Sequence, residues 1–234
     1  MSFVLRMIAE GEHQQQDFKL RVDDAAKIAK TLCAFANSQG GRLLIGVRDS
    51  GEVAGCRVEE EFHMVQCAAE VHCHPPVAFE SQVWKHQFLS ILEIRVPQSA
   101  NRPHFLEATH PKLGHKTWQA YLRHEDKIIK ASPVQVKVWQ YQLNLERSEF
   151  RYDMHVGKLF RKWREGGLLR FPQVARTARI SFEEAEDLLA LLMVWGIVDS
   201  TYGKQGHRYG LASEEALDKL EQEGAEAFRW KHAG

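Results

Sequence analysis

Three acidic residues and one lysine near the amino end of the sequence have the types and the spacing to do chemistry. They are Glu12, Asp17, Lys19 and Asp49. Clustered carboxylates most often bind a hard cation or share protons. Separate, solvated acids in turns would use the same residue types, because Asp also favours turns. Both interpretations are open from the residue types alone.

A short strand is predicted at the second of these acids. The segment Asp17-Phe18-Lys19-Leu20 alternates between polar and apolar residues, as half-buried strands do. We expect Phe18 and Leu20 to face a core. Asp17 and Lys19 would then share the solvent face.

Two turns decide whether the acids can meet. Glu12 is five residues from Asp17, a spacing that does not align two side chains on one straight element. Gly11 and the glutamines after it permit a bend that brings Glu12 back towards Asp17. Asp49 follows an apolar run, Leu43 to Val47, that reads as a strand. Acids at the start of one strand and the end of another can meet on one rim of a sheet.

An ordered set of motifs resembles the Schlafen AlbA_2 domain over roughly residues 3–140. The motifs are Glu12, Asp17-Phe18-Lys19, Ala34-Phe35-Ala36-Asn37, Gly40-Gly41 to Val47, Asp49 to Gly51, Arg102-Pro103-His104 and Tyr121-Leu122-Arg123. The resemblance implies a nucleic-acid-binding fold and, from many bacterial members, a DNA-binding protein or transcriptional regulator.

The resemblance also implies a ribonuclease as an alternative function. In Schlafen proteins that cut transfer RNA, three acids form the site, and they fall here on Glu12, Asp17 and Asp49. These acids would hold one or two Mg²⁺ or Mn²⁺ ions that activate a water. Lys19 would contact a phosphate oxygen near the cut bond. Asp17 stands where the family has Glu, so its carboxylate reaches one methylene less far.

Basic residues on the expected sheet are candidates for contacts with DNA or RNA. They are Lys19, Arg42, Arg48, Arg123, Lys127 and Lys130. Lys137 follows, with Val134, Val136, Val138 and Trp139 close to it in the sequence. Basic residues beside Trp and Tyr suit a surface that follows phosphates and stacks bases. An ordinary strand with a solvated lysine face is the other interpretation.

The chain is expected to be α+β, a mixed sheet with packed helices at 22–37 and 59–73. Strands are predicted at Val77–Trp84 and Phe88–Val96, joined as a hairpin, and at Lys116–Arg123. Residues 98–115 read as an irregular segment. These elements form an expected first domain, residues 1–145.

The remaining sequence resembles a winged helix-turn-helix over residues 150–212, after a linker near Leu143 to Ser148 and before a charged helix or tail at 213–234. Helices are expected from Met154, Phe171 and Phe182, and a wing from Ile197 to Tyr209. The expected recognition helix begins with four acids, which repel phosphates. The wing with Arg176, Arg179, Lys204 and Arg208 would therefore bind nucleic acid, or the domain would pack against protein.

Composition limits the alternatives. Apolar residues make up 44% of the 234 residues, charged residues 26%, and the formal net charge is zero, so nucleic-acid binding needs a local basic patch. A protein–protein assembly or sensor module without nucleic acid is the rival hypothesis. No membrane segment or secretory signal is recognisable, so we expect a cytoplasmic protein. No phosphate loop is recognisable either, so the sequence does not support ATP binding.

Two further expectations concern thiols and assembly. The four cysteines have no paired spacing, which favours free thiols. The histidines and cysteines between His63 and His74 lack the second ligand pair of a zinc finger. Because Schlafen proteins use two such domains in tandem and this chain has one, we expect a homodimer.

Overall fold

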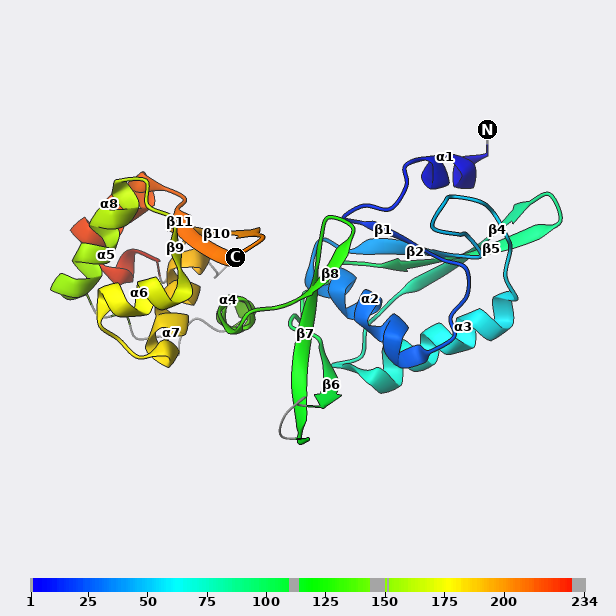
Figure 1. Cartoon of the computed structure of the whole chain (residues 1–234), viewed down its shortest axis with the longest axis horizontal. Helices are drawn as coiled ribbons and strands as arrows, with labels where there is room; N and C mark the ends of the chain where they lie inside the picture. The colour runs from blue at the N-terminus through cyan, green and yellow to red at the C-terminus, as the bar shows by residue number, and fades with distance from the viewer. Residues whose placement is uncertain (1, 110–113, 144–149, 151, 229–234) are drawn as a thin grey trace. The chain divides into compact units, whose positions relative to one another are not determined.

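The chain forms two compact units and confirms the α+β class expected from the sequence (Figure 1). This computed structural model describes residues 2–109, 114–143, 150 and 152–228. The first unit ends at Ala131 and the second begins at Ser132. None of the helices in the described ranges is long and apolar enough to cross a membrane.

The first unit contains a four-stranded mixed sheet. Its strands are β1 (Gln16–Lys19), β2 (Gly41–Ile45), β4 (Glu80–His86) and β5 (Leu89–Val96). Their order is β1–β2–β5–β4, with β1 and β2 parallel and the other neighbours antiparallel. The expected hairpin between residues 77 and 96 is confirmed as β4 and β5.

Helices cover both faces of this sheet. They are α1 (Phe3–Ala9), α2 (Ala25–Asn37) and α3 (Val58–Cys67). On one face, Met7 of α1 packs with Phe18 and Leu44. On the other, α2 buries Leu32 and Phe35 completely, which stabilises the fold by about 1.5–3 kcal/mol for each side chain. The helix predicted at 22–37 is confirmed.

The ends of α2 follow from local chemistry. Asp24 caps the helix, because its Oδ1 accepts the amide hydrogens of Ala26 at 2.9 Å and Lys27 at 3.2 Å. Gly40 has a φ of +73°, and a Cβ there would lie 2.8 Å from the Val96 carbonyl oxygen. Only glycine meets both conditions, so the chain can turn tightly into β2.

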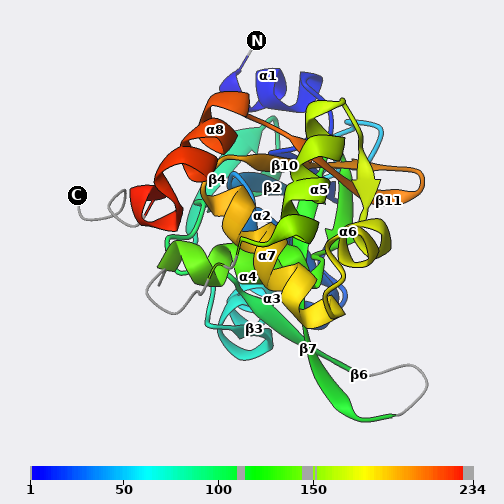
Figure 2. The ribbon, with the colours of Figure 1, turned by 90° about the vertical axis from the view of Figure 1, so that its left-hand side faces the viewer.

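A second sheet packs on α2 from the other side. Its strands, in the order β3–β6–β7–β8, are β3 (Cys73–His74), β6 (Phe105–Thr109), β7 (Lys116–His124) and β8 (Lys127–Lys130), all antiparallel. Leu106 and Tyr121 join the core that α2 shares with the first sheet. Figure 2 shows the extended β6–β7 hairpin.

The second helix, expected at 59–73, is confirmed, because α3 continues past Cys67 as one π-helical turn, η1 (Ala68–His72), and Cys73 begins β3. Two other expectations for the first unit were wrong. The segment 98–115 contains strand β6. In β1, Asp17 is buried at 5% exposure whereas Leu20, just after the strand, is 40% exposed, because a charged partner from the second sheet lies over Asp17.

The second unit has the helices and small antiparallel sheet of a winged helix. Its elements are α4 (Pro133–Leu143), α5 (Met154–Arg164), β9 (Leu169–Arg170), α6 (Phe171–Ala178), α7 (Phe182–Val194), β10 (Val198–Gly203), β11 (Gly206–Leu211), α8 (Glu214–Glu223) and η3 (Ala225–Phe228). The sheet order is β10–β11–β9. The predicted capping box at α7 is confirmed, with Ser181 Oγ accepting the Glu184 amide and Glu184 Oε2 accepting the Ser181 amide.

The alternative interpretation of Val134–Trp139 as an ordinary strand is wrong, because these residues form α4. Val134 and Val138 are four residues apart and both are buried, as one helix face requires. α4 packs against α7 within the second unit, so this unit begins before the boundary expected at 145. Residues 144–149 of the expected linker lie outside the described residues.

Candidate nucleic-acid interface

The expected bend at the amino end of β1 is present. Gly11 has a φ of +73°, and His13 and Gln16 pair across the bend. Oε1 of Glu12 then accepts the amide hydrogen of Phe18 at 2.9 Å. The bend therefore returns Glu12 to the side of Asp17, as the sequence predicted.

Asp17 is neutralised by two cations rather than left in solvent. Its Oδ2 lies 2.9 Å from Lys19 Nζ and its Oδ1 lies 3.1 Å from Arg123 Nη2. The Arg123 side chain is only 1% exposed. It also donates to the carbonyl oxygens of His13 and Gln16 at 3.3 and 3.1 Å.

Arg123 therefore connects the two sheets of the first unit. It comes from β7, binds the start of β1, and its guanidinium lies 5.4 Å from the centre of the Phe35 ring on α2. A buried arginine with its charge already paired does not reach a phosphate. This position does not fit the nucleic-acid contact expected from the sequence.

The environment of Glu12 raises the pKa of its carboxyl. Partial burial is the largest cause, and the negative charge of Asp17 adds to it, while the Phe18 amide acts in the opposite direction. The two carboxylates thus interact, as expected for the first two acids.

A shared divalent cation does not fit this arrangement. A hard cation needs several oxygen ligands, but both oxygens of Asp17 face cations and Oε1 of Glu12 accepts an amide. Asp49 lies in an exposed turn between Val47 and Val53. Across the part of the chain that the structure describes, no three His, Cys, Asp or Glu residues are grouped to hold a metal ion.

The other expected basic residues of the first sheet have acidic neighbours. Arg42 on β2 lies 3.6 Å from Glu10 and is partly buried. Arg48 lies 3.3 Å from Glu52 across the exposed turn. These pairs lower the net positive charge that either arginine presents to a phosphate.

A basic surface lies where α2 meets β8, and we call it the α2–β8 face. It consists of Lys27 and Lys30 on α2 and Lys127 and Lys130 on β8, all exposed. Figure 1 shows α2 beside β7 and β8, in agreement with their contacts. Within the described ranges, the only acid paired with any of the four is Asp24, 3.9 Å from Lys27.

Tyr121 connects the two halves of the α2–β8 face. Lys30 Nζ lies 5.6 Å from the centre of its ring. Lys130 is its partner in the β7–β8 register, so both side chains leave the same side of the sheet. The lysines are thus brought together by tertiary structure from positions about a hundred residues apart.

An aromatic hollow adjoins this face. It has a volume of about 480 Å³, and its lining includes Lys30, Tyr121, His74 and Trp118. The Trp118 side chain is 59% exposed and its ring centre lies 5.3 Å from that of His74. Glu70 and Glu107 also line the hollow, and Lys30 is the lysine among its lining residues. An exposed indole beside a lysine is a suitable platform for an unpaired base.

The comparisons with known proteins bear on this unit. Residues 12–132, slightly more than half of the chain, match the family described as Schlafen, AlbA_2. The chain belongs to the Schlafen AlbA_2 family. The matched range includes every strand from β1 to β8, together with α2 and α3. Schlafen AlbA_2 domains are commonly associated with nucleic-acid binding.

Two solved structures resemble this AlbA_2 protein at low identity. The DIP2311 protein from Corynebacterium diphtheriae has 18% identity and a TM-score of 0.44 over 88% of this chain. The chain spans only 39% of DIP2311. The N-terminal domain of a RecG-related protein from Nitrosomonas europaea has 20% identity and a TM-score of 0.39, covering 56% of this chain and 92% of that one. Among curated proteins, none matches significantly.

Sequence reasoning found Lys127 and Lys130 but missed Lys30 and Trp118. Lys30 could have been found from its helix, because Lys27 and Lys30 are three apart and lie on the polar side of α2. Trp118 could have been found from the alternation of β7. Neither signal reveals that the two residues line one hollow, because that depends on how α2 packs on the second sheet.

Proposed function

We propose that this protein binds nucleic acid through the α2–β8 face and acts as a regulator of transcription. The observation that carries the proposal is the convergence of four exposed lysines from α2 and β8. Phosphate contacts by lysine supply most of the affinity of non-specific nucleic-acid binding. Membership of the AlbA_2 family supports the same conclusion, and the winged-helix-like second unit supports the regulatory role.

The aromatic hollow suggests which form of nucleic acid is preferred. Trp118 can stack on a base only where that base is unpaired, while the lysines follow the backbone. We therefore infer a preference for single strands or for duplexes with unpaired bases. A protein–protein module, the rival hypothesis, would also use an exposed indole, but lysines are depleted in protein–protein interfaces.

The proposed function contains no cleavage step. Glu12 and Asp17 do interact, but Oε1 of Glu12 accepts the Phe18 amide and both oxygens of Asp17 face Lys19 and Arg123. With Mn²⁺ present, we expect transfer RNA to remain intact over the time in which binding saturates. Nicking by purified protein that Glu12→Ala and Asp49→Ala both abolish would restore the ribonuclease hypothesis.

A homodimer is part of the proposal, because one AlbA_2 domain offers only one α2–β8 face. Light scattering at micromolar concentration is expected to give twice the mass of the chain. The mass of a single chain would remove the dimer and leave the binding proposal intact.

The test of binding is fluorescence anisotropy with single-stranded DNA, duplex DNA and transfer RNA at two salt concentrations. Binding that depends on phosphate contacts weakens steeply with salt. The double variant Lys127→Gln/Lys130→Gln is expected to lower the slope of log affinity against log salt by about two, roughly one for each lysine. A matched control is Arg57→Gln/Lys85→Gln, which removes two exposed charges elsewhere in the same unit.

Three outcomes are informative. If the wild type binds and only the β8 variant weakens, the proposal stands. If both double variants weaken equally, the α2–β8 face is not the interface. If the wild type binds none of the three nucleic acids at low salt, the proposed function is wrong and the protein–protein hypothesis gains.

A further inference from the structure

Two arginines of the second unit face each other across a strand pair. Arg170 on β9 and Arg208 on β11 are direct partners in the antiparallel register. Direct partners project from the same face of a sheet, and like charges in this position destabilise it. The arrangement needs a compensating group.

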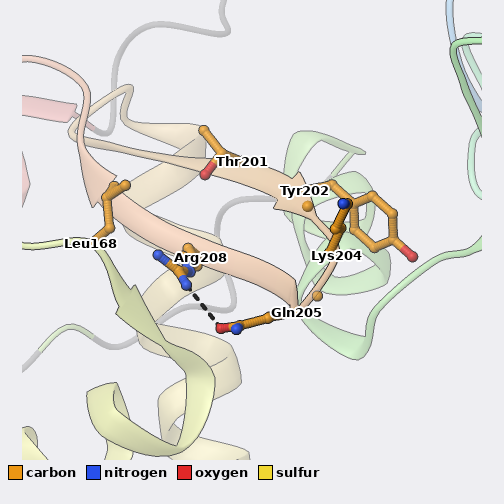
Figure 3. A pocket seen from close by; sticks show the side chains of 8 residues that line it. Leu168, Thr201, Tyr202, Lys204, Gln205 and Arg208 are labelled. Carbon is orange, nitrogen blue, oxygen red and sulfur yellow. Dashed lines mark hydrogen bonds between the residues drawn. The ribbon is translucent and has the colours of Figure 1, made fainter.

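The group that the protein places between the two arginines is neutral, the side-chain amide of Gln205. Both guanidinium groups donate to the same atom, Oε1 of Gln205, with Arg208 at 2.9 Å. Figure 3 shows Arg208 and Gln205 joined in this way near the end of the β10–β11 hairpin. Within the described part of the chain, neither arginine forms an ion pair with a carboxylate.

Two adjoining hollows open beside the pair. They have volumes of about 370 and 420 Å³ and share Leu168 and Arg208. Lys204 lines one of them and Arg170 the other. None of the described residues that line either hollow is acidic. The positive charge of this surface is therefore complementary to an anion.

In a helix-turn-helix, the second helix usually contacts the bases of DNA. Here that helix is α7, and both its charge and its packing oppose such contacts. The first half of α7 is acidic, and α4 lies against it. Lys137 of α4 lies 2.7 Å from Asp187 and 3.6 Å from Glu186, and Tyr141 donates to Asp187 at 2.5 Å. These contacts are internal to the second unit, so α4 covers the acidic part of α7 that would otherwise face DNA.

We propose that Arg170 and Arg208 form a binding site for a backbone phosphate of nucleic acid. The inference rests on the proposed function, to which it adds a second contact in the other unit. Two guanidinium groups fixed by one amide oxygen present their remaining N–H groups to a phosphate, which can accept several at once. Lys204 and the exposed side of Tyr202 at the hairpin end extend the surface along the backbone.

The first experiment uses the full chain and fluorescence anisotropy with duplex and single-stranded DNA. The variant Arg170→Gln/Arg208→Gln is expected to lower the salt slope by about two, because two phosphate-directed charges are lost. The matched control is Lys158→Gln/Arg161→Gln, which removes two exposed charges from α5 of the same unit. A wild-type slope in the arginine variant, or an equal loss in the control, would overturn the inference while leaving the proposed function standing.

The second experiment does not require nucleic-acid binding. Thermal unfolding is measured with inorganic pyrophosphate and with potassium chloride at equal ionic strength. Pyrophosphate is expected to raise the Tm of the wild type and of the α5 control but not that of the arginine variant, because a ligand stabilises only the state that binds it. A rise of equal size in all three proteins would contradict a site at Arg170 and Arg208.

The two experiments separate the two proposals. If the wild type binds no nucleic acid but pyrophosphate still raises its Tm through these arginines, the proposed function fails. The arginine pair would then be a site for a small phosphate, and its assignment to a nucleic-acid backbone would be overturned. If the arginine variant alone loses both responses, the inference is supported.

Discussion

Arg123 in the first unit and the Arg170–Arg208 pair in the second show two opposite uses of arginine on a small sheet. Arg123 is buried, and a carboxylate and two carbonyl oxygens accept its hydrogen bonds. Arg170 and Arg208 face each other beside open hollows, with only an amide oxygen between them. A cation whose charge is already neutralised holds the fold together, whereas one whose charge is not can hold a ligand.

The same distinction separates residues within the first unit. Lys19 approaches Asp17, and Arg42 approaches Glu10. Lys127 and Lys130 are as basic but lie exposed on an edge strand. Counting basic residues in a sequence does not separate these groups, because the count does not show which cation lies close to an acid in space.

The largest expected effect is at Arg123. Arg123→Ala leaves Asp17 buried with one partner fewer, and breaking a buried pair in this way costs about 3–5 kcal/mol. The free energy of unfolding in urea measures the loss. Arg57→Ala, at an exposed position, is the control and is expected to change stability by less than about 0.5 kcal/mol. Equal losses in the two variants would show that Arg123 does not connect the sheets.

The next effect concerns binding rather than stability. Trp118→Ala is expected to weaken single-strand binding by about 1–3 kcal/mol, the value of one stacked base. The side chain is 59% exposed, so the Tm changes little. Trp118→Phe retains an aromatic face and is expected to recover most of the affinity. If Trp118→Phe binds as weakly as Trp118→Ala, then stacking is not the reason.

A charge reversal sharpens the comparison of the two units. Arg208→Glu places opposite charges directly across β9 and β11, which is expected to raise stability by about 0.2–1 kcal/mol. The same variant removes the proposed phosphate site. Urea unfolding at low salt measures the rise, and Arg208→Gln is the control that removes charge without creating a pair. A lower stability in Arg208→Glu would mean that Arg208 is held by contacts like those of Arg123.

The smallest effect depends on pH. The pKa of Glu12 is raised above its ordinary value of 4.5, so the folded state binds this proton more tightly and stability falls as the pH rises through the raised pKa. Glu12→Gln removes the charge and keeps an oxygen for the Phe18 amide. It is expected to raise stability at neutral pH by about 0.5 kcal/mol or less, because the carboxyl is partly solvated. This gain in stability disappears below about pH 4, where the Glu12 carboxyl is protonated in the wild type as well. If Glu12→Gln remained more stable than the wild type at that pH, the charge of Glu12 would not be the cause.

Local patterns alone predicted much of the fold. The cap at Asp24, the amphipathic face of α2, the bend at Gly11, the β4–β5 hairpin and the capping box at Ser181 all depend on residues within a few positions of each other. Such interactions involve neighbouring residues, so the order of residue types is enough to predict them. The bend also brought Glu12 to Asp17, so the contact between these two acids was predictable.

Interactions between distant segments decided the rest. The alternation of Val134, Val136 and Val138 fits a strand, and the spacing of the first and last also fits a helix face; packing against α7 selected the helix. Asp17 was expected to face solvent. It is buried instead, because Arg123, which lies more than a hundred residues away in the sequence, binds its carboxylate. The sequence determined which side chains could carry charge and which segments could form elements. Only the tertiary structure decided which charges are neutralised, because the Coulomb energy depends on distance and burial in space and not on separation along the chain.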